Sequence, residues 1–236
     1  MTQEQWLVCM DPAHMIDYLF FDRRVSDRKL RLFACACCRR IKRLIEDEDI
    51  PELLDLAEGF ADGGVDQTSF VTHREVLLRR YGSVFAGLPE YHPADAAREA
   101  VLRAASFAYD TIPETYEDND DAPYPDWAAT FARYAVGGEQ GEFRSEQTEG
   151  SSQVKLLNDI FGNPFRPVTV EPGWRTANVV ELARTIYEER AFDRLPILAN
   201  ALMDAGCNDE QVLDHCRGPG PHVRGCWVVD LVLGKA

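Results

Sequence analysis

The chain has 236 residues, of which 45% are hydrophobic, and 25 Lys plus Arg stand against 40 Asp plus Glu, a net charge of -15. This apolar content is enough for a folded core, so the composition excludes a wholly disordered chain. No apolar run reaches about 18 residues and the start lacks a secretory pattern, so we expect a cytoplasmic protein with no membrane partner. The acidic balance argues against a nucleic-acid partner, because phosphate binding needs a basic contact surface.

Helical patterns dominate the first half of the chain. Thr2 and Gln5 resemble a capping box, and Asp11 with Pro12 starts a second helix. Ser26 caps the clearest helix, which carries an apolar face and a basic face over residues 26–45. We expect further helices over residues 51–60, 68–81 and 93–109.

The second half begins with a change of composition. Residues 110–126 are rich in acids and prolines, residues 127–136 predict a short helix, and residues 137–152 are rich in glycine. From residue 153 onward four or five helices alternate with short turns, and the last helix is expected over residues 222–233. The candidate N-caps are Thr176, Asp193, and either Asn208 or Asp209.

No segment has a persuasive period-2 pattern, so the predicted fold class is all-α. We expect a multi-helix array in which C-terminal helix hairpins pack on the N-terminal amphipathic helix. The predicted organisation is an N-terminal helical region (1–109), an acidic and Gly-rich linker (110–152) and a C-terminal helical region (153–236) that shares one core with the first.

Three stretches of the chain resemble a paralogous protein family of planctomycete bacteria. They are SDRKLRLFACACCRRI (residues 26–41), NPFRPV (163–168) and AFDRLPILANALMDAGCNDEQVLDHCRGPGPHVRGCWVVDLVLGK (191–235), together 67 of the 236 residues. The resemblance implies a cytoplasmic bacterial protein with many paralogues. It implies no activity, cofactor or catalytic residue.

The cysteines suggest a metal site. Seven cysteines cannot all pair within one chain, and we expect reduced thiols in a cytoplasm. Three lie on the basic helix, and three more lie near His215 and His222 at the C-terminal end. Because His222 and Cys226 are four apart on a predicted helix, they could bind zinc together with Cys35 and Cys38, which are three apart.

Two other interpretations of these thiols stay open. Cysteine on an apolar face commonly behaves as a small hydrophobe, and no Cys-x-x-Cys pair is present, so we favour core packing and no cofactor. Alternatively, His222 could activate Cys226 as a nucleophile, with Arg217 and Arg224 favouring the thiolate. No third, orienting group is identifiable for that pair.

Residues 23–43 hold nine cations and one acid, a local charge of +8. This basic face could dock phosphate, nucleic acid or an acidic partner through Arg28, Arg31, Arg39, Arg40 and Arg43. We favour internal neutralisation by the acids at 46–49 or 114–126, since a charge run usually forms a solvated or paired face.

The sequence therefore predicts a cytoplasmic helical module that interacts with an unidentified protein partner. The alternatives are a zinc-binding or thiol-dependent enzyme that uses the C-terminal Cys/His cluster, and a phosphate or nucleic-acid binder that uses the helix at 26–45. Whether the protein is an enzyme stays open at this point.

Overall fold

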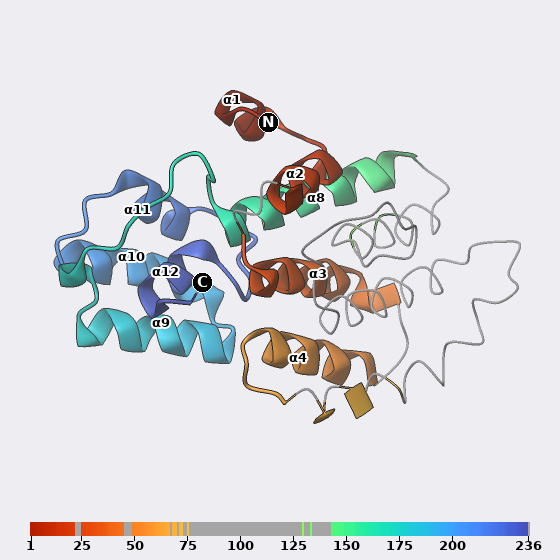
Figure 1. The fold of residues 1–236 in the computed structure, drawn as a ribbon. Coiled ribbons are helices and arrows are strands. Elements are labelled where there is room, and N and C mark those ends of the chain that lie inside the picture. Colours follow the sequence, from red (N-terminus) through yellow and green to blue (C-terminus); the bar gives the residue numbers. More distant parts are fainter. Residues whose placement is uncertain are drawn as a thin grey trace, which may run out of the picture. The chain divides into compact units, whose positions relative to one another are not determined.

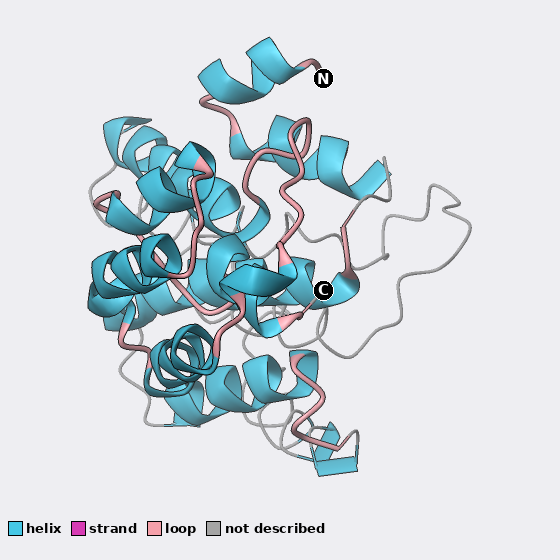
Figure 2. Ribbon diagram, turned by 90° about the vertical axis from the view of Figure 1, so that its left-hand side faces the viewer, coloured by secondary structure: helices cyan, strands magenta, loops and turns pink. Residues whose placement is uncertain are grey.

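A computed structural model describes residues 1–21, 25–44, 49–66, 68–69, 71–72, 75, 129, 133 and 143–235. These residues form helices, turns and loops, and none of them lies in a β-strand (Figure 2). The predicted all-α class is therefore confirmed. The helix predicted over 93–109 and the segment 110–126 lie outside the described residues, as do most of the helices predicted over 68–81 and 127–136.

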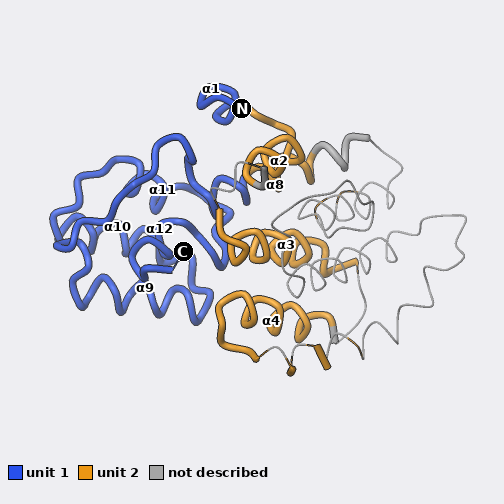
Figure 3. Tube along the Cα trace, in the orientation of Figure 1, with its two compact units in different colours: residues 1–8, 155–236 blue, residues 9–154 orange. Residues whose placement is uncertain are grey.

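Contacts divide the chain into two compact units (Figure 3). Unit 1 comprises Met1–Val8 and Lys155–Ala236, and unit 2 comprises Cys9–Val154. Helix α8 (Phe143–Phe161) contributes its first turns to unit 2 and its last turns to unit 1. The grouping of the chain into three regions with one shared core stays a prediction.

The start of α8 corrects one boundary of the predicted linker. Residues 143–152 are helical rather than irregular, although Gly150 lies among them. A glycine inside a helix costs about 1 kcal/mol relative to alanine, which local contacts can offset. Here a Cβ on Gly150 would lie 3.8 Å from the side chains of Pro12 and Arg133, an ordinary contact distance, so the packing does not require the glycine. The neighbouring Glu149 is buried and binds Arg40.

Unit 2 is built on α2 (Pro12–Phe21), α3 (Asp27–Ile41), the short η1 (Lys42–Leu44) and α4 (Asp49–Ala61) (Figure 1). The hydroxyl of Ser26 accepts a hydrogen bond from the Lys29 backbone N–H, which confirms the predicted N-cap of α3. Helix α3 packs on α4 and buries its apolar face, including Cys35, Cys37 and Cys38.

Unit 1 holds most of the remaining helices. They are α1 (Gln3–Val8), η2 (Pro172–Trp174), α9 (Ala177–Glu189), η3 (Phe192–Arg194), α10 (Leu195–Asp204), α11 (Glu210–Arg217) and α12 (Trp227–Leu233). Helix α9 packs against α10 and α12, and α10 packs against α11. Thr176 and Asp209 accept hydrogen bonds from backbone N–H groups three residues later, which confirms Thr176 and selects Asp209 over Asn208. The predicted Asp193 cap is wrong, because Asp193 lies inside η3 and α10 begins after Arg194 with no side-chain cap.

The core of unit 1 is an apolar cluster centred on these packed helices. Its members include Val179, Ile186, Leu195, Leu198, Leu202, Val212, Val228 and Val232. The indole N–H of Trp6, a buried side chain of α1, donates to Asn158 Oδ1 at 3.1 Å. None of the described helices has the length and apolar character needed to span a bilayer.

The last helix begins later than predicted. Residues 222–226 form a loop and a turn, and α12 starts at Trp227. Gly225 has φ +92, in the left-handed region that interrupts a right-handed helix, and Cys226 is the N-cap with φ -46 and ψ 125. His222 and Cys226 therefore do not share a helix face.

Candidate metal centre

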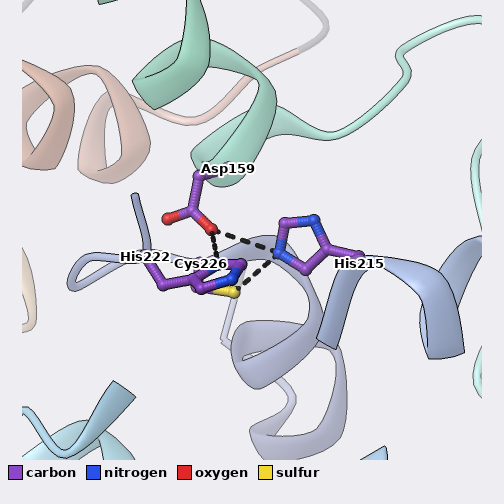
Figure 4. A group of neighbouring side chains, drawn as sticks. All are labelled: Asp159, His215, His222 and Cys226. Atoms are coloured by element: carbon purple, nitrogen blue, oxygen red, sulfur yellow. Dashed lines mark hydrogen bonds and ion pairs between the residues drawn. The ribbon is translucent and has the colours of Figure 1, made fainter. Parts of the chain in front are cut away.

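Four side chains that can bind a metal ion meet in unit 1. Asp159, His215, His222 and Cys226 each offer one ligand atom, and all four atoms lie within 4.8 Å of one another. Figure 4 shows the four side chains pointing toward a common centre. Among the described residues, no second group of three or more Cys, His, Asp or Glu side chains is arranged to hold an ion.

Each ligand comes from a different part of the helical framework. Asp159 lies in the last turn of α8, which ends at Phe161, and His215 lies on α11, whose start is fixed by the Asp209 cap. His222 lies in the loop that follows α11, and Cys226 immediately precedes α12. The packing of unit 1 therefore brings together residues that are up to 67 positions apart in the sequence.

Short distances join the four groups. Oδ1 of Asp159 lies 2.6 Å from Nδ1 of His222 and 3.1 Å from Nε2 of His215. The same Nε2 of His215 lies 3.2 Å from Sγ of Cys226. Four ligands at 2.0–2.3 Å from a tetrahedral zinc ion would be about 3.3–3.7 Å apart. The three short pairs would therefore have to open slightly, and the widest pair, at up to 4.8 Å, would have to close by about 1 Å.

Two backbone groups hold the ligands from behind. The Val223 N–H donates to Oδ2 of Asp159 at 2.9 Å. The carbonyl oxygen of Gly218 lies 3.3 Å from Nε2 of His222. Such outer contacts orient metal ligands and are typical of protein metal sites.

The site is largely withdrawn from solvent. Cys226 is fully buried, the side chain of Asp159 is 2% exposed, and those of His215 and His222 are 16% and 11% exposed. Burial, aided by the charge of Asp159, raises the pKa of the Cys226 thiol well above its usual value. Without a metal this cysteine is therefore protonated at neutral pH.

The two charged partners stabilise each other. Burial alone would raise the pKa of Asp159, but hydrogen bonds from His215 and His222 outweigh burial and lower that pKa. Burial alone would lower the pKa of His222, but the hydrogen bond to Asp159 and the charge of that carboxylate outweigh burial, so the pKa of His222 is raised.

The arrangement differs from a catalytic Cys-His-Asp relay. In a relay, the two ring nitrogens of the histidine face different partners, one the nucleophile and the other the acid. Here a single nitrogen, Nε2 of His215, faces both Cys226 and Asp159. Convergence of ligand atoms on one point is the geometry of a metal site rather than of proton transfer along a chain.

The structure unites only half of the predicted zinc ligands. His222 and Cys226 belong to the group, whereas Cys35 and Cys38 lie on α3 in unit 2 with both thiols buried. The ligand set that combined all four stays a prediction, and the group in unit 1 has four members without them. His215 was predicted to lie near the C-terminal cysteines but not to be a ligand, and Asp159 was not predicted at all.

The arginines proposed to activate Cys226 have other contacts. The guanidinium of Arg217 donates to the sulfur of Met203 on α10. The guanidinium of Arg224 lies 5.1 Å from the centre of the Tyr187 ring. Because the pKa of the Cys226 thiol is raised, these contacts do not favour the activated thiolate that was one interpretation of the sequence.

The basic face of α3 is largely neutralised within unit 2. Arg39 lies 2.6 Å from both Glu58 and Asp55 of α4, and Arg40 lies 3.0 Å from Glu149 of α8. Two further pairs join Arg28 to Asp62 at 2.8 Å and Arg31 to Asp27 at 4.0 Å. Four arginines of this face are therefore paired with acids other than the predicted ones. Residues 46–48 and 114–126 lie outside the described residues, so neutralisation by the acids at 46–49 or 114–126 stays a prediction. Docking of phosphate through Arg28, Arg31, Arg39, Arg40 and Arg43 stays a prediction.

Comparison of the chain with family models, with curated proteins and with solved structures found no match.

Proposed function

We propose that Asp159, His215, His222 and Cys226 bind one divalent transition-metal ion, and that this ion holds together a helical module formed by unit 1. The observation that carries the proposal is the convergence of four ligand atoms within 4.8 Å from α8, α11 and the loop before α12. Imidazole nitrogen, carboxylate oxygen and cysteine sulfur are all established ligands of such ions.

The proposed role of the metal is structural rather than catalytic. A catalytic metal keeps one coordination position for water or substrate, whereas a structural site fills all four positions with protein ligands. The group has four ligands and is mostly buried, which supports the closed type. An open groove in unit 1 of about 620 Å³ is lined by residues 166–168, 209–211 and 214, none of which is a ligand.

This role favours a binding module over an enzyme. A thiol-dependent enzyme would need a cysteine that is accessible and easily ionised. Cys226 is fully buried and its thiol pKa is raised. We therefore propose a metal-stabilised helical module that acts in the cytoplasm by binding a protein partner. Membership of the planctomycete family, which rests on the three motifs of the sequence, is part of the same proposal.

Metal analysis of the purified protein tests the proposal. We expect about one equivalent of metal per chain, lost on substitution His215→Gln and retained in the matched control His14→Gln, which changes an exposed histidine of α2. A second pair compares Cys226→Ala with Cys216→Ala, because both thiols are fully buried and only the first is a ligand.

A chelator should also lower the unfolding temperature of the wild-type protein and leave that of His215→Gln unchanged. The proposal is wrong if wild-type protein, refolded with zinc, cobalt or nickel, retains none of these metals after desalting.

A further inference from the structure

We infer that the site selects zinc, because the backbone contacts behind the ligands restrict Asp159 and His222 to one coordinating atom each. The inference rests on the proposed function and adds the identity of the ion. A site with four single-atom ligands suits an ion that accepts tetrahedral coordination, which is the preferred geometry of zinc in structural sites.

Asp159 is restricted to Oδ1. Its other oxygen, Oδ2, accepts the hydrogen bond from the Val223 N–H at 2.9 Å. A carboxylate that chelates an ion through both oxygens would have to give up this bond and leave the Val223 N–H unpaired inside a largely buried site. Asp159 therefore favours ions that bind a single carboxylate oxygen over calcium, which takes six to eight oxygen ligands.

His222 is restricted to Nδ1. The carbonyl oxygen of Gly218 can only accept a hydrogen bond, so its 3.3 Å contact with the ring keeps a proton on Nε2. In the metal-free site Nδ1 also carries a proton, which it donates to Oδ1 of Asp159 at 2.6 Å, so a metal ion would replace that proton and take the lone pair of Nδ1. This is the arrangement of a metal-binding histidine whose second nitrogen is held by an outer partner.

The remaining ligands disfavour the ions that prefer oxygen, and they disfavour copper(II). One thiolate and two imidazoles make the site too soft for magnesium, calcium or manganese, which prefer oxygen. Copper(II) binds strongly to nitrogen and sulfur but prefers a tetragonal arrangement. The His215 ring lies 5.2 Å from the Trp227 ring at 58°, which limits rotation toward such a plane.

Spectroscopy of reconstituted full-length protein tests the inference directly. X-ray absorption of the zinc form should give a first shell of one sulfur at about 2.3 Å and three nitrogen or oxygen atoms at about 2.0 Å. The cobalt(II) form should show the intense visible bands of tetrahedral cobalt and a thiolate charge-transfer band. Manganese and calcium should not compete with zinc at a hundredfold excess.

A pair of variants tests the role of the outer contact. Val223→Pro removes the N–H that holds Oδ2, and Val223→Ala keeps it. We expect Val223→Pro to lower zinc affinity about 10–100-fold and to narrow the preference for zinc over manganese, while Val223→Ala changes neither. If Val223→Pro does not fold, the X-ray absorption of the wild-type zinc form decides the question.

The outcomes separate the inference from the proposed function. A six-coordinate ion, a carboxylate bound through both oxygens, or equal zinc affinity in the two Val223 variants would overturn zinc selection while leaving metal binding intact. Wild-type protein that binds none of the metals would remove the proposed function itself.

Discussion

The contact between Gly162 and Trp227 offers a test of how the fold aims two of the metal ligands. Gly162 follows the end of α8 three residues after Asp159, and Trp227 follows Cys226 at the start of α12. A Cβ built on Gly162 would lie 3.1–3.3 Å from three atoms of the Trp227 ring. The substitution Gly162→Ala therefore pushes apart the two segments that carry Asp159 and Cys226.

Two terms set the size of the effect. Gly162 has φ +64, and an alanine in the left-handed region costs roughly 1–2 kcal/mol. Displacement of Trp227 adds a cost of overpacking, typically about 1–3 kcal/mol. The expected loss in the free energy of unfolding is then about 2–5 kcal/mol, the sum of these terms.

A second glycine separates the two terms. Gly234 follows the end of α12 with φ +71, and its added Cβ would lie 3.5 Å from the Arg175 guanidinium, an ordinary contact distance. Gly234→Ala should therefore show the backbone cost alone. Denaturant unfolding of both variants measures the difference, and zinc titration should show weaker binding only in Gly162→Ala. Equal stability losses in the two variants, with unchanged zinc affinity, would refute the argument that this contact aims the ligands.

Three further predictions concern charge and accessibility. Metal-free protein should be most stable between about pH 4 and 6.5. Denaturant unfolding of chelator-treated protein at a series of pH values measures this. Asp159 has a lowered pKa in the folded state, so its contribution to stability is lost as the pH falls through that pKa. His222 has a raised pKa, so its contribution to stability is lost as the pH rises through that pKa. Glu149→Ala should destabilise unit 2 by about 2–3 kcal/mol in urea unfolding, below the usual cost of breaking a buried pair because the Arg40 side chain is 34% exposed. A thiol reagent should modify Cys9 alone under native conditions, as read by mass spectrometry, because the other six cysteines are buried.

Each of these has a control within the same chain. Asp159→Asn should weaken the loss of stability at both low and high pH. If the dependence of stability on pH is unchanged by that substitution, the pair of Asp159 and His222 is not its cause. Glu181→Ala removes an exposed pair with Arg184 and should change stability by at most about 0.5 kcal/mol. Native labelling of Cys226 in metal-free protein would contradict its burial.

Local rules predicted the starts of most helices correctly. Thr2 and Gln5 form the reciprocal hydrogen bonds of a capping box, at 2.7 and 3.2 Å, and Ser26 caps α3 as expected. These signals depend on a few adjacent residues, so the sequence contains them in full. The linker prediction failed at residues 143–152 because glycine content alone does not reveal the buried contact between Glu149 and Arg40.

The site was harder to predict because its ligands come from separate elements. The spacing of His222 and Cys226 suggested a helix face, whereas Gly225 at φ +92 makes the segment a turn that brings both side chains to the same point. No motif marked Asp159 as a ligand, since an acid near a helix end is common. A weak hint was the position of Asp159 among buried residues on both sides, where an acid needs a partner.

Cys226 is the residue whose surroundings a metal explains best. The hydrogen bonds among Asp159, His215 and His222 already compensate the burial of the carboxylate, so burial of charge alone does not require an ion. A buried thiol needs no polar partner, as Cys38 illustrates on the apolar face of α3. Cys226 instead faces the ring nitrogen of His215 and lies close enough to Asp159 for that charge to raise its pKa further, an unfavourable setting for ionisation. A bound cation reverses this effect because it stabilises the thiolate and the carboxylate together, and all four side chains then bind the same positive charge.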